Sequence, residues 1–249
     1  MRRRLIVGNW KMNELNPSSS DLTKLFQTTY HDKLDIIIAP PATLLSSIKT
    51  RILPSKVMLA GQDCHKNTEG SHTGDISARL LRDAGANYVI LGHSERRIGH
   101  KESNRTIMLK AKEAIGQDLI PILCVGESLM EYRTKTTLEM IKRQLRYSLS
   151  KEIINRDAII AYEPVWAIGS NKTPSLKEIE RVHSFVREYL SANFGSRAGN
   201  MCRIIYGGSV NNLNASEIFK TRDVDGALVG GASLKIQDFL KIINLMGKL

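Results

Sequence analysis

The feature of this sequence that most constrains its fold is a repeating alternation of short apolar runs and amphipathic stretches. Eight apolar runs, rich in Ile, Val and Leu, recur at a spacing of roughly 30 residues, and each has the length of a strand buried on both faces. The predicted strands are residues 5–7, 35–39, 57–60, 88–91, 119–125, 159–162, 203–206 and 227–229.

The stretches between these runs have apolar residues at the period of an α-helix. In the first, which follows Pro17, one face carries Leu22, Leu25 and Phe26. A later one begins with Ser175, and Glu178 three residues on predicts a capping box. The other predicted helices span residues 42–51, 77–84, 103–115, 136–149, 215–219 and 234–246, and the one that begins at Ser175 runs to about residue 192.

Eight strands that alternate with eight helical segments predict an α/β fold, a closed (β/α)8 barrel of parallel strands ringed by helices. An open doubly wound sheet is the competing architecture, but its first strand is usually followed by the pattern GxGxxG. Gly8-Asn9-Trp10 does not have that pattern. We therefore expect residues 1–249 to form a single barrel domain with a large buried core.

The charge balance favours an anionic ligand. The chain carries 36 Lys and Arg residues against 25 Asp and Glu, a formal net charge of +11. The basic residues are scattered, with no long run beyond Arg2-Arg3-Arg4, so nucleic acid is not an expected partner. A small phosphorylated substrate suits the same charge.

Cysteine spacing and the absence of targeting patterns predict a cytoplasmic protein. Cys64, Cys124 and Cys202 are odd in number and far apart, which fits reduced thiols better than a disulfide framework. The basic start resembles that of a signal peptide, but the apolar run Leu5-Ile6-Val7 is broken at once by Gly8-Asn9-Trp10-Lys11, so no secretory signal is expected. No apolar run approaches the length of a membrane span.

In a barrel of this kind the carboxyl ends of the strands share one face, where active sites lie. Singly, polar residues at strand ends are more often solvated or structural. Together they would provide a carboxylate base, an imidazole, a fixed cation and backbone N–H donors at one mouth. The residues at the predicted strand ends are Asn9, Lys11, His93, Glu95, Glu163, Ser209, Gly230 and Gly231.

The segment after the sixth strand is unusual for a surface loop. Glu163 ends the strand, Pro164 stops it, and residues 165–168 form an apolar stretch closed by Gly169. One interpretation is a lid that closes over a reacting centre and excludes water while Glu163 acts as a base. The alternative is that residues 165–168 pack into the core and Glu163 is a solvated strand end.

Two glycine pairs follow the seventh and eighth strands, Gly207-Gly208 before Ser209 and Gly230-Gly231. Glycine lets backbone amides approach an anion without interference from a Cβ atom. A short helix that starts after Gly231 would point its amino terminus at the same anion, and phosphate sites recur at this place in barrels. The alternative is that both pairs are tight turns.

Five motifs, in their order and spacing, resemble those of the triosephosphate isomerase family, and they extend along the whole chain. The resemblance implies a TIM barrel. The motifs are Asn9-Trp10-Lys11, Leu91-Gly92-His93-Ser94-Glu95-Arg96-Arg97, Ala161-Tyr162-Glu163-Pro164-Val165-Trp166-Ala167-Ile168-Gly169, Tyr206-Gly207-Gly208-Ser209-Val210 and Val229-Gly230-Gly231-Ala232-Ser233-Leu234.

The resemblance implies an isomerase that interconverts dihydroxyacetone phosphate and D-glyceraldehyde 3-phosphate through an enediolate, in glycolysis, gluconeogenesis and the pentose shunt, without cofactor or metal. It implies Glu163 as the base and His93 as a neutral imidazole that polarises the carbonyl. Lys11 matches a cation that attracts the substrate and stabilises oxyanion charge, with Asn9 orienting it and Glu95 as its partner. The phosphate-binding amides match Gly169, Ser209, Gly230 and Gly231.

The long loop from Gly61 to Gly74 resembles the family's dimer loop, and a structureless loop of this length otherwise has little reason to exist in a compact domain. The resemblance implies that Thr73 reaches into the active site of the partner subunit and that Gln62 lies at the interface. We therefore expect a homodimer.

The sequence departs from the family at the far end of the lid, where Ser170-Asn171 and Pro174 replace the usual residues. These changes affect the expected lid kinetics, not the reaction. An aldolase with a Schiff-base lysine is a rival, but it needs an inward-pointing lysine within a strand, and Lys11 lies in a loop. A basic binding module is a second rival, and it leaves Glu163 and His93 unexplained.

Overall fold

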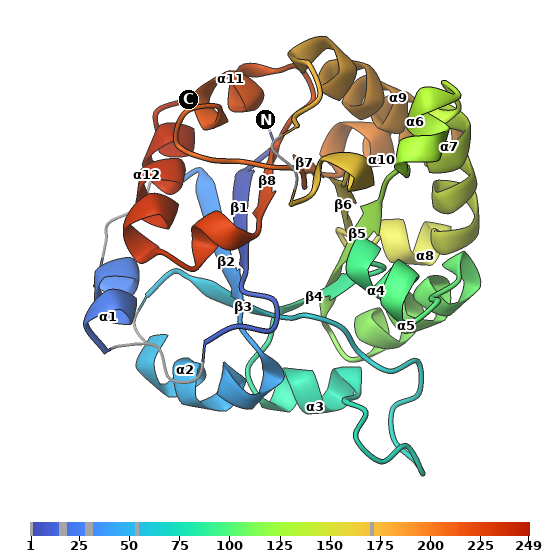
Figure 1. The fold of residues 1–249 in the computed structure, drawn as a ribbon. Coiled ribbons are helices and arrows are strands. Elements are labelled where there is room, and N and C mark those ends of the chain that lie inside the picture. Colours follow the sequence, from blue (N-terminus) through green and yellow to red (C-terminus); the bar gives the residue numbers. More distant parts are fainter. Residues whose placement is uncertain (1, 15–18, 28–31, 53–54, 170–171) are drawn as a thin grey trace.

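The protein is an eight-stranded barrel in a computed structural model that describes residues 2–14, 19–27, 32–52, 55–169 and 172–249. The strands pair in chain order, all parallel, and β1 closes the sheet against β8 (Figure 1). Each predicted strand is present, with ends that differ by one or two residues. The strands are β1 (Arg4–Asn9), β2 (Leu34–Ala39), β3 (Met58–Gly61), β4 (Tyr88–Leu91), β5 (Ile120–Val125), β6 (Ile159–Tyr162), β7 (Ile204–Tyr206) and β8 (Gly226–Val229).

A ring of helices surrounds the sheet, and each predicted helix is present (Figure 1). Ser175 and Glu178 form the predicted capping box at the start of α9. The predicted helices correspond to α1 (Ser19–Gln27), η1 (Ala42–Leu44) with α2 (Leu45–Ile52), α3 (Ala78–Asp83), α5 (Asn104–Gly116), α7 (Thr137–Ser148), α9 (Leu176–Phe194), α11 (Ala215–Lys220) and η3 (Gly231–Ser233) with α12 (Ile236–Gly247).

The expectation of eight helical segments was too low, because short helices also occur in the connections. With three to six residues they make at most two turns, too few for apolar residues to repeat on one face, so periodicity does not reveal them. The additional segments are α4 (Ser94–Gly99), α6 (Leu129–Arg133), α8 (Lys151–Ile154), α10 (Ser196–Met201) and the 3-10 turn η2 (Val165–Ala167).

The strands are apolar on both faces because the barrel has two cores. Along β1, Leu5 and Val7 belong to an inner cluster to which all eight strands contribute, and Ile6 between them belongs to the layer beneath the helices. The inner cluster fills the barrel, so the barrel interior is packed and the ligand site must lie at one of its ends.

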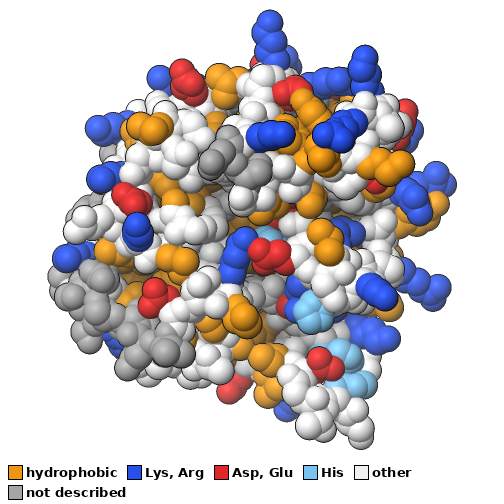
Figure 2. All heavy atoms as spheres, in the orientation of Figure 1, with side chains coloured by type: hydrophobic (Ala, Val, Ile, Leu, Met, Phe, Trp, Pro, Cys, Tyr) orange, Lys and Arg blue, Asp and Glu red, His pale blue; other side chains and the backbone are white. Residues whose placement is uncertain are grey.

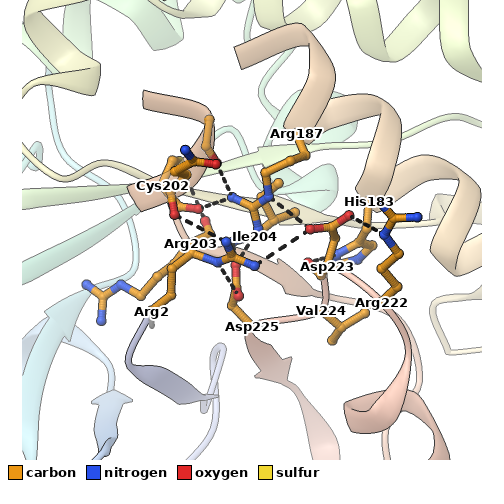
Figure 3. Close-up of polar contacts among 12 residues, drawn as sticks. Arg2, His183, Arg187, Cys202, Arg203, Ile204, Arg222, Asp223, Val224 and Asp225 are labelled. Atoms are coloured by element: carbon orange, nitrogen blue, oxygen red, sulfur yellow. Dashed lines mark hydrogen bonds and ion pairs between the residues drawn. The ribbon is translucent and has the colours of Figure 1, made fainter. Parts of the chain in front are cut away.

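The amino-terminal end of the barrel is held by a buried ionic network centred on Arg187 of α9 (Figure 3). Its guanidinium bonds Asp223 at 3.1 Å and Asp225 at 2.7 Å, and it also donates to the carbonyls of Gly199 and Cys202. Arg2 bonds the other oxygen of Asp225 at 2.6 Å. These contacts join the amino terminus, α9 and the segments that lead into β7 and β8.

No helix in the described ranges is both long and apolar enough to cross a membrane. On the face shown in Figure 2, Lys and Arg side chains are spread around the rim over several helices, with acidic side chains between them.

Candidate active site

A cavity of about 480 Å³ opens at the carboxyl ends of the strands. All eight residues predicted to form the site border it: Asn9, Lys11, His93, Glu163, Gly169, Ser209, Gly230 and Gly231. The sequence analysis assigned no role to several neighbours that also line it, namely Val210, Asn211, Leu228 and Ala232. The structure thus brings together residues that are up to 223 positions apart in the chain (Asn9 and Ala232).

Glu163 and His93 face each other at the bottom of this cavity. Glu163 is only 2% exposed, and its Oε2 accepts the backbone N–H of Ser94 at 2.9 Å. Its Oε1 lies 3.0 Å from Nε2 of His93 as an ion-pair contact and has no hydrogen-bond partner among the described residues. Glu163 is therefore not a solvated strand end, and one of its oxygens has no hydrogen bond within the described chain.

The histidine is oriented by the start of α4. His93 is the N-cap residue of this helix, and its Nδ1 accepts the backbone N–H of Glu95 at 3.3 Å. A ring whose Nδ1 accepts this bond carries its proton on Nε2, the atom that faces Glu163. The helix start thus orients the ring, with Nε2 facing Glu163 in the cavity.

The backbone of Glu163 runs between two glycines, where no side chain would fit. A Cβ atom on Gly126 would lie 1.7 Å from the carbonyl oxygen of Glu163, and one on Gly207 would lie 2.9 Å from its Cγ. Gly207 was expected to serve an anion, and it also makes room for the carboxylate side chain.

Lys11 is held in a conformation that is rare for a residue with a side chain, with φ of 54°. Its N–H donates to the side chain of Asn9 at 3.0 Å, and its carbonyl accepts from Gln62 at 2.8 Å. Its ammonium group reaches across the mouth to Glu95 at 2.5 Å, the partner that the resemblance implied. Gln62, expected at an interface, therefore contacts the backbone of the predicted cationic residue within the same chain.

The apolar segment after Glu163 is partly buried and is anchored by a carboxylate. Trp166 donates to Glu127 at 2.8 Å and stacks on Tyr132, with ring centroids 4.1 Å apart. Tyr162 also donates to Glu127 at 3.2 Å, and burial raises the pKa of this carboxyl group. Ala167 is buried, as the core interpretation expects, whereas Ile168 borders the cavity, and the lid remains a prediction.

Sequence reasoning missed the anchoring role of Glu127, although its place after the glycine at the end of β5 was a usable signal. Two of the residues that depart from the family pattern, Ser170 and Asn171, lie outside the described residues. Pro174 is described and buried.

Within the described residues, one group has the composition of a metal site. His65, His72 and Asp75, on the loop after β3, have ligand atoms within 4.8 Å of one another. Asn67 already occupies one nitrogen of each imidazole ring. Its backbone N–H donates to Nδ1 of His65 at 3.1 Å, and its side-chain nitrogen lies 2.9 Å from Nε2 of His72. These contacts are those of a hydrogen-bonded loop.

Taken together, the fold and the cavity define a (β/α)8-barrel enzyme with its site at the carboxyl ends of the strands. Residues 4–246 match the sequence model of the family described as Triosephosphate isomerase. The triosephosphate isomerase of Ruegeria sp. (strain TM1040) is 47% identical over 243 residues, which are 98% of each chain. That of Xanthobacter flavus is 45% identical over 246 residues, covering 99% of this chain and 98% of the other.

The structure gives the same result. A crystal structure of triosephosphate isomerase from Bartonella henselae superposes with a TM-score of 0.88 at 39% sequence identity, and the match covers 98% of each chain. This chain belongs to the triosephosphate isomerase family, as its motifs predicted.

Proposed function

We propose that this protein interconverts dihydroxyacetone phosphate and D-glyceraldehyde 3-phosphate by proton transfer through an enediolate, as a cytoplasmic enzyme of glycolysis and gluconeogenesis. Membership of the family supports the reaction. The observation that carries the mechanism is the approach of Glu163 to Nε2 of His93, 3.0 Å apart in a cavity that Lys11 also borders.

Glu163 acts as the base in this proposal. The carboxylate takes a proton from the carbon beside the substrate carbonyl and returns it to the neighbouring carbon. Its buried position between Gly126 and Gly207 restricts its movement, which suits a group that must come within about 3–3.5 Å of a reacting carbon. The unpaired Oε1 leaves an acceptor for that proton.

His93 and Lys11 stabilise the charge that develops on the oxygens. The neutral imidazole donates a hydrogen bond from its Nε2–H to the substrate oxygens and so polarises the carbonyl. Triosephosphate isomerases are the best-known example of this role. The ammonium of Lys11 attracts the anionic substrate and remains near the oxyanion, and Asn9 holds the Lys11 backbone. All the acid–base groups belong to the chain, so the proposed reaction needs no cofactor and no metal.

The phosphate lies in the part of the cavity bordered by Gly169, Ser209, Gly230 and Gly231, where glycine lets the backbone approach an anion. The segment from Val165 to Gly169 closes over it and excludes water. A closed site holds the enediolate in one geometry and suppresses elimination of the phosphate, the side reaction that destroys the substrate.

The decisive test is the substitution Glu163→Asp, which retains the charge and withdraws the carboxylate by one methylene. We expect kcat to fall by roughly 10²-fold with little change in KM, because a displacement near 1 Å costs about that much. Glu163→Gln, which has no base, should fall further. A coupled isomerase assay on purified protein measures both, and turnover near the wild-type rate in either variant would refute the assignment.

We further propose a homodimer formed through the loop between β3 and α3, which projects from the barrel (Figure 1). Thr73 lies on its exposed part, and the apolar side chains of Met12, Ile76 and Leu80 are exposed on or near it, with Met12 96% exposed. An interface would cover them. Replacing residues 66–72 with a short linker should give a soluble, weakly active monomer, and a fully active monomeric wild type in sedimentation at assay concentration would contradict this.

A further inference from the structure

A buried glutamine in the helical layer contacts the backbone end of β5. Gln144 of α7 is 7% exposed, and its side-chain amide bonds both backbone groups of a single residue, Gly126. The N–H of Gly126 donates to Oε1 at 2.7 Å, and Nε2 donates to the carbonyl of Gly126 at 2.8 Å. The side chain thus takes the place of a strand neighbour for the residue that follows β5.

Gly126 lies against the backbone of Glu163. The residues on either side of it bond this segment: Glu163 N–H donates to the carbonyl of Val125 at 2.8 Å, and Val165 N–H donates to the carbonyl of Glu127 at 3.0 Å. Gly126 itself lacks a side chain because the carbonyl of Glu163 occupies that space. The position of Gly126 therefore sets how closely the Glu163 backbone approaches β5.

Gln144 is polar at this buried place because its amide pairs the N–H and the carbonyl of Gly126. The other buried residues of α7 include Ile141 and Leu145, which pack without polar groups. Burying an amide is unfavourable unless its hydrogen bonds are made in full, so a glutamine fixes the geometry of its partners more than it contributes net stability.

We infer that Gln144 is a positioning residue for the reaction, which acts through Gly126 on the backbone of Glu163 and on Glu127, the anchor of Trp166. The inference rests on the proposed function, because it requires Glu163 to be the base. Loss of the two bonds frees the end of β5 to shift, and the carboxylate of Glu163 shifts with it. Activity is lost mainly through kcat, since Ser209, Gly230 and Gly231, which the proposed function places at the phosphate, follow β7 and β8.

The first test is Gln144→Met, which keeps the length of the side chain and removes both hydrogen bonds. We expect kcat to fall about tenfold or more, with KM within about twofold of the wild-type value. The matched control is Ser148→Ala, one turn further along α7. Ser148 is 1% exposed and donates to Asn104 at 3.5 Å, so the control removes a buried polar group of the same helix but no hydrogen bond made to β5 itself, and its kcat should stay at the wild-type value.

The second test is Gln144→Glu, whose protonation state decides whether it can replace the amide. The protonated acid accepts through its carbonyl and donates through its O–H, so it satisfies both groups of Gly126. The ionised carboxylate only accepts and repels the carbonyl of Gly126. The ratio of the kcat of this variant to that of wild type should be close to one at acid pH. It should fall as the pH rises through the pKa of the buried Glu side chain. The same ratio for Ser148→Ala should show no such step.

The outcomes separate this inference from the proposed function. A Gln144→Met protein with lowered Tm but wild-type kcat would make Gln144 structural only and overturn the inference. If Gln144→Met fails to fold, a flat relative kcat for Gln144→Glu across the pH range would overturn it instead. Wild-type turnover in Glu163→Gln would refute the proposed function itself, whatever the Gln144 variants do.

Discussion

The two ends of the barrel use the same kinds of charged residue for opposite purposes. At the amino-terminal end, Arg187 bonds Asp223, Asp225 and two carbonyls, so four of its five N–H donors are taken by the chain (Figure 3). At the carboxyl end, Lys11 has the carboxylate of Glu95, which is itself half exposed. The charged groups of the amino-terminal end are paired within the chain, whereas Lys11 at the carboxyl end remains accessible to a ligand.

The pKa values of the amino-terminal network reflect this saturation. Burial by itself raises the pKa of Asp223, but hydrogen bonds from Ser184 and Arg187 outweigh it and leave the pKa lowered. At the carboxyl end, buried oxygens without a hydrogen bond include Oε1 of Glu163 and Oε2 of Glu127. Unpaired buried polar atoms are unfavourable for stability. Of these two oxygens only Oε1 of Glu163 belongs to a residue that borders the cavity, and the amino-terminal network also contains one such atom, Nε2 of His183.

The comparison predicts its largest effect at Arg187. Arg187→Met leaves the carboxylates of Asp223 and Asp225 without their main partner, and breaking a buried pair costs roughly 3–5 kcal/mol of unfolding free energy. The kcat of the folded protein should stay within about twofold of wild type. Urea unfolding measures the loss. Arg222→Ala is the matched control, because Arg222 is exposed and lies 3.7 Å from Asp223, and it should cost under about 1 kcal/mol.

Lys11→Met should produce the opposite result. We expect kcat/KM to fall by roughly 10²–10³-fold, equivalent to about 3–4 kcal/mol, because a preorganised cation is lost from the site. The unfolding free energy should change by no more than about 1 kcal/mol, the value of a partly exposed ion pair. Lys56→Met, at an exposed pair with Asp32, is the control for charge. A loss of kcat/KM below fivefold would show that Lys11 is a surface residue.

The next effect concerns pH and the amino-terminal end. Burial lowers the pKa of His183 to about 4 from 6.5, so between these values the unfolded chain binds a proton that the folded chain does not. The contribution of His183 to the unfolding free energy, roughly 3 kcal/mol, is fully present above about pH 6.5 and is lost as the pH falls towards 4. His183→Asn keeps a donor for the carbonyl of Asp223 and should remove that part of the slope. Unfolding curves for both proteins from pH 7 to 4 test this, and parallel slopes would contradict it.

The smallest effect is predicted for the lid anchor. Trp166→Phe keeps a ring to stack on Tyr132 and removes the N–H that bonds Glu127, which Tyr162 continues to satisfy. The loss of about 1 kcal/mol corresponds to roughly a fivefold fall in kcat. Phosphate released per isomerisation should rise, because the lid is less well held. If neither quantity changes, the contact has no part in the reaction.

Much of the fold was predictable because its signals are local. Apolar runs such as residues 159–162 have a strand's length and end at a proline or glycine, so strand positions were correct to one or two residues. The capping box at Ser175 was equally local. Segments such as α6, α8 and α10 were missed because their short lengths leave no period to read.

The candidate site was predictable in composition but only partly in geometry. Strand ends alone grouped residues such as Lys11, His93 and Glu163, because parallel strands of a barrel must all end at the same face. Their individual roles came from the resemblance to a family. The left-handed backbone of Lys11 and the hydrogen bond from the Ser94 N–H to Glu163 have no signal in the sequence.

The sequence by itself determined which segments are strands and which residues stand at their ends, because periodicity and chain-breaking residues act over a few positions. Only the tertiary structure decided which side chains meet across layers. Gln144 contacts Gly126, Trp166 contacts Glu127, and Arg187 contacts Asp225, pairs separated by 18, 39 and 38 positions. Such contacts depend on how each helix is rotated and packed against the sheet, and that packing is settled by the whole core at once.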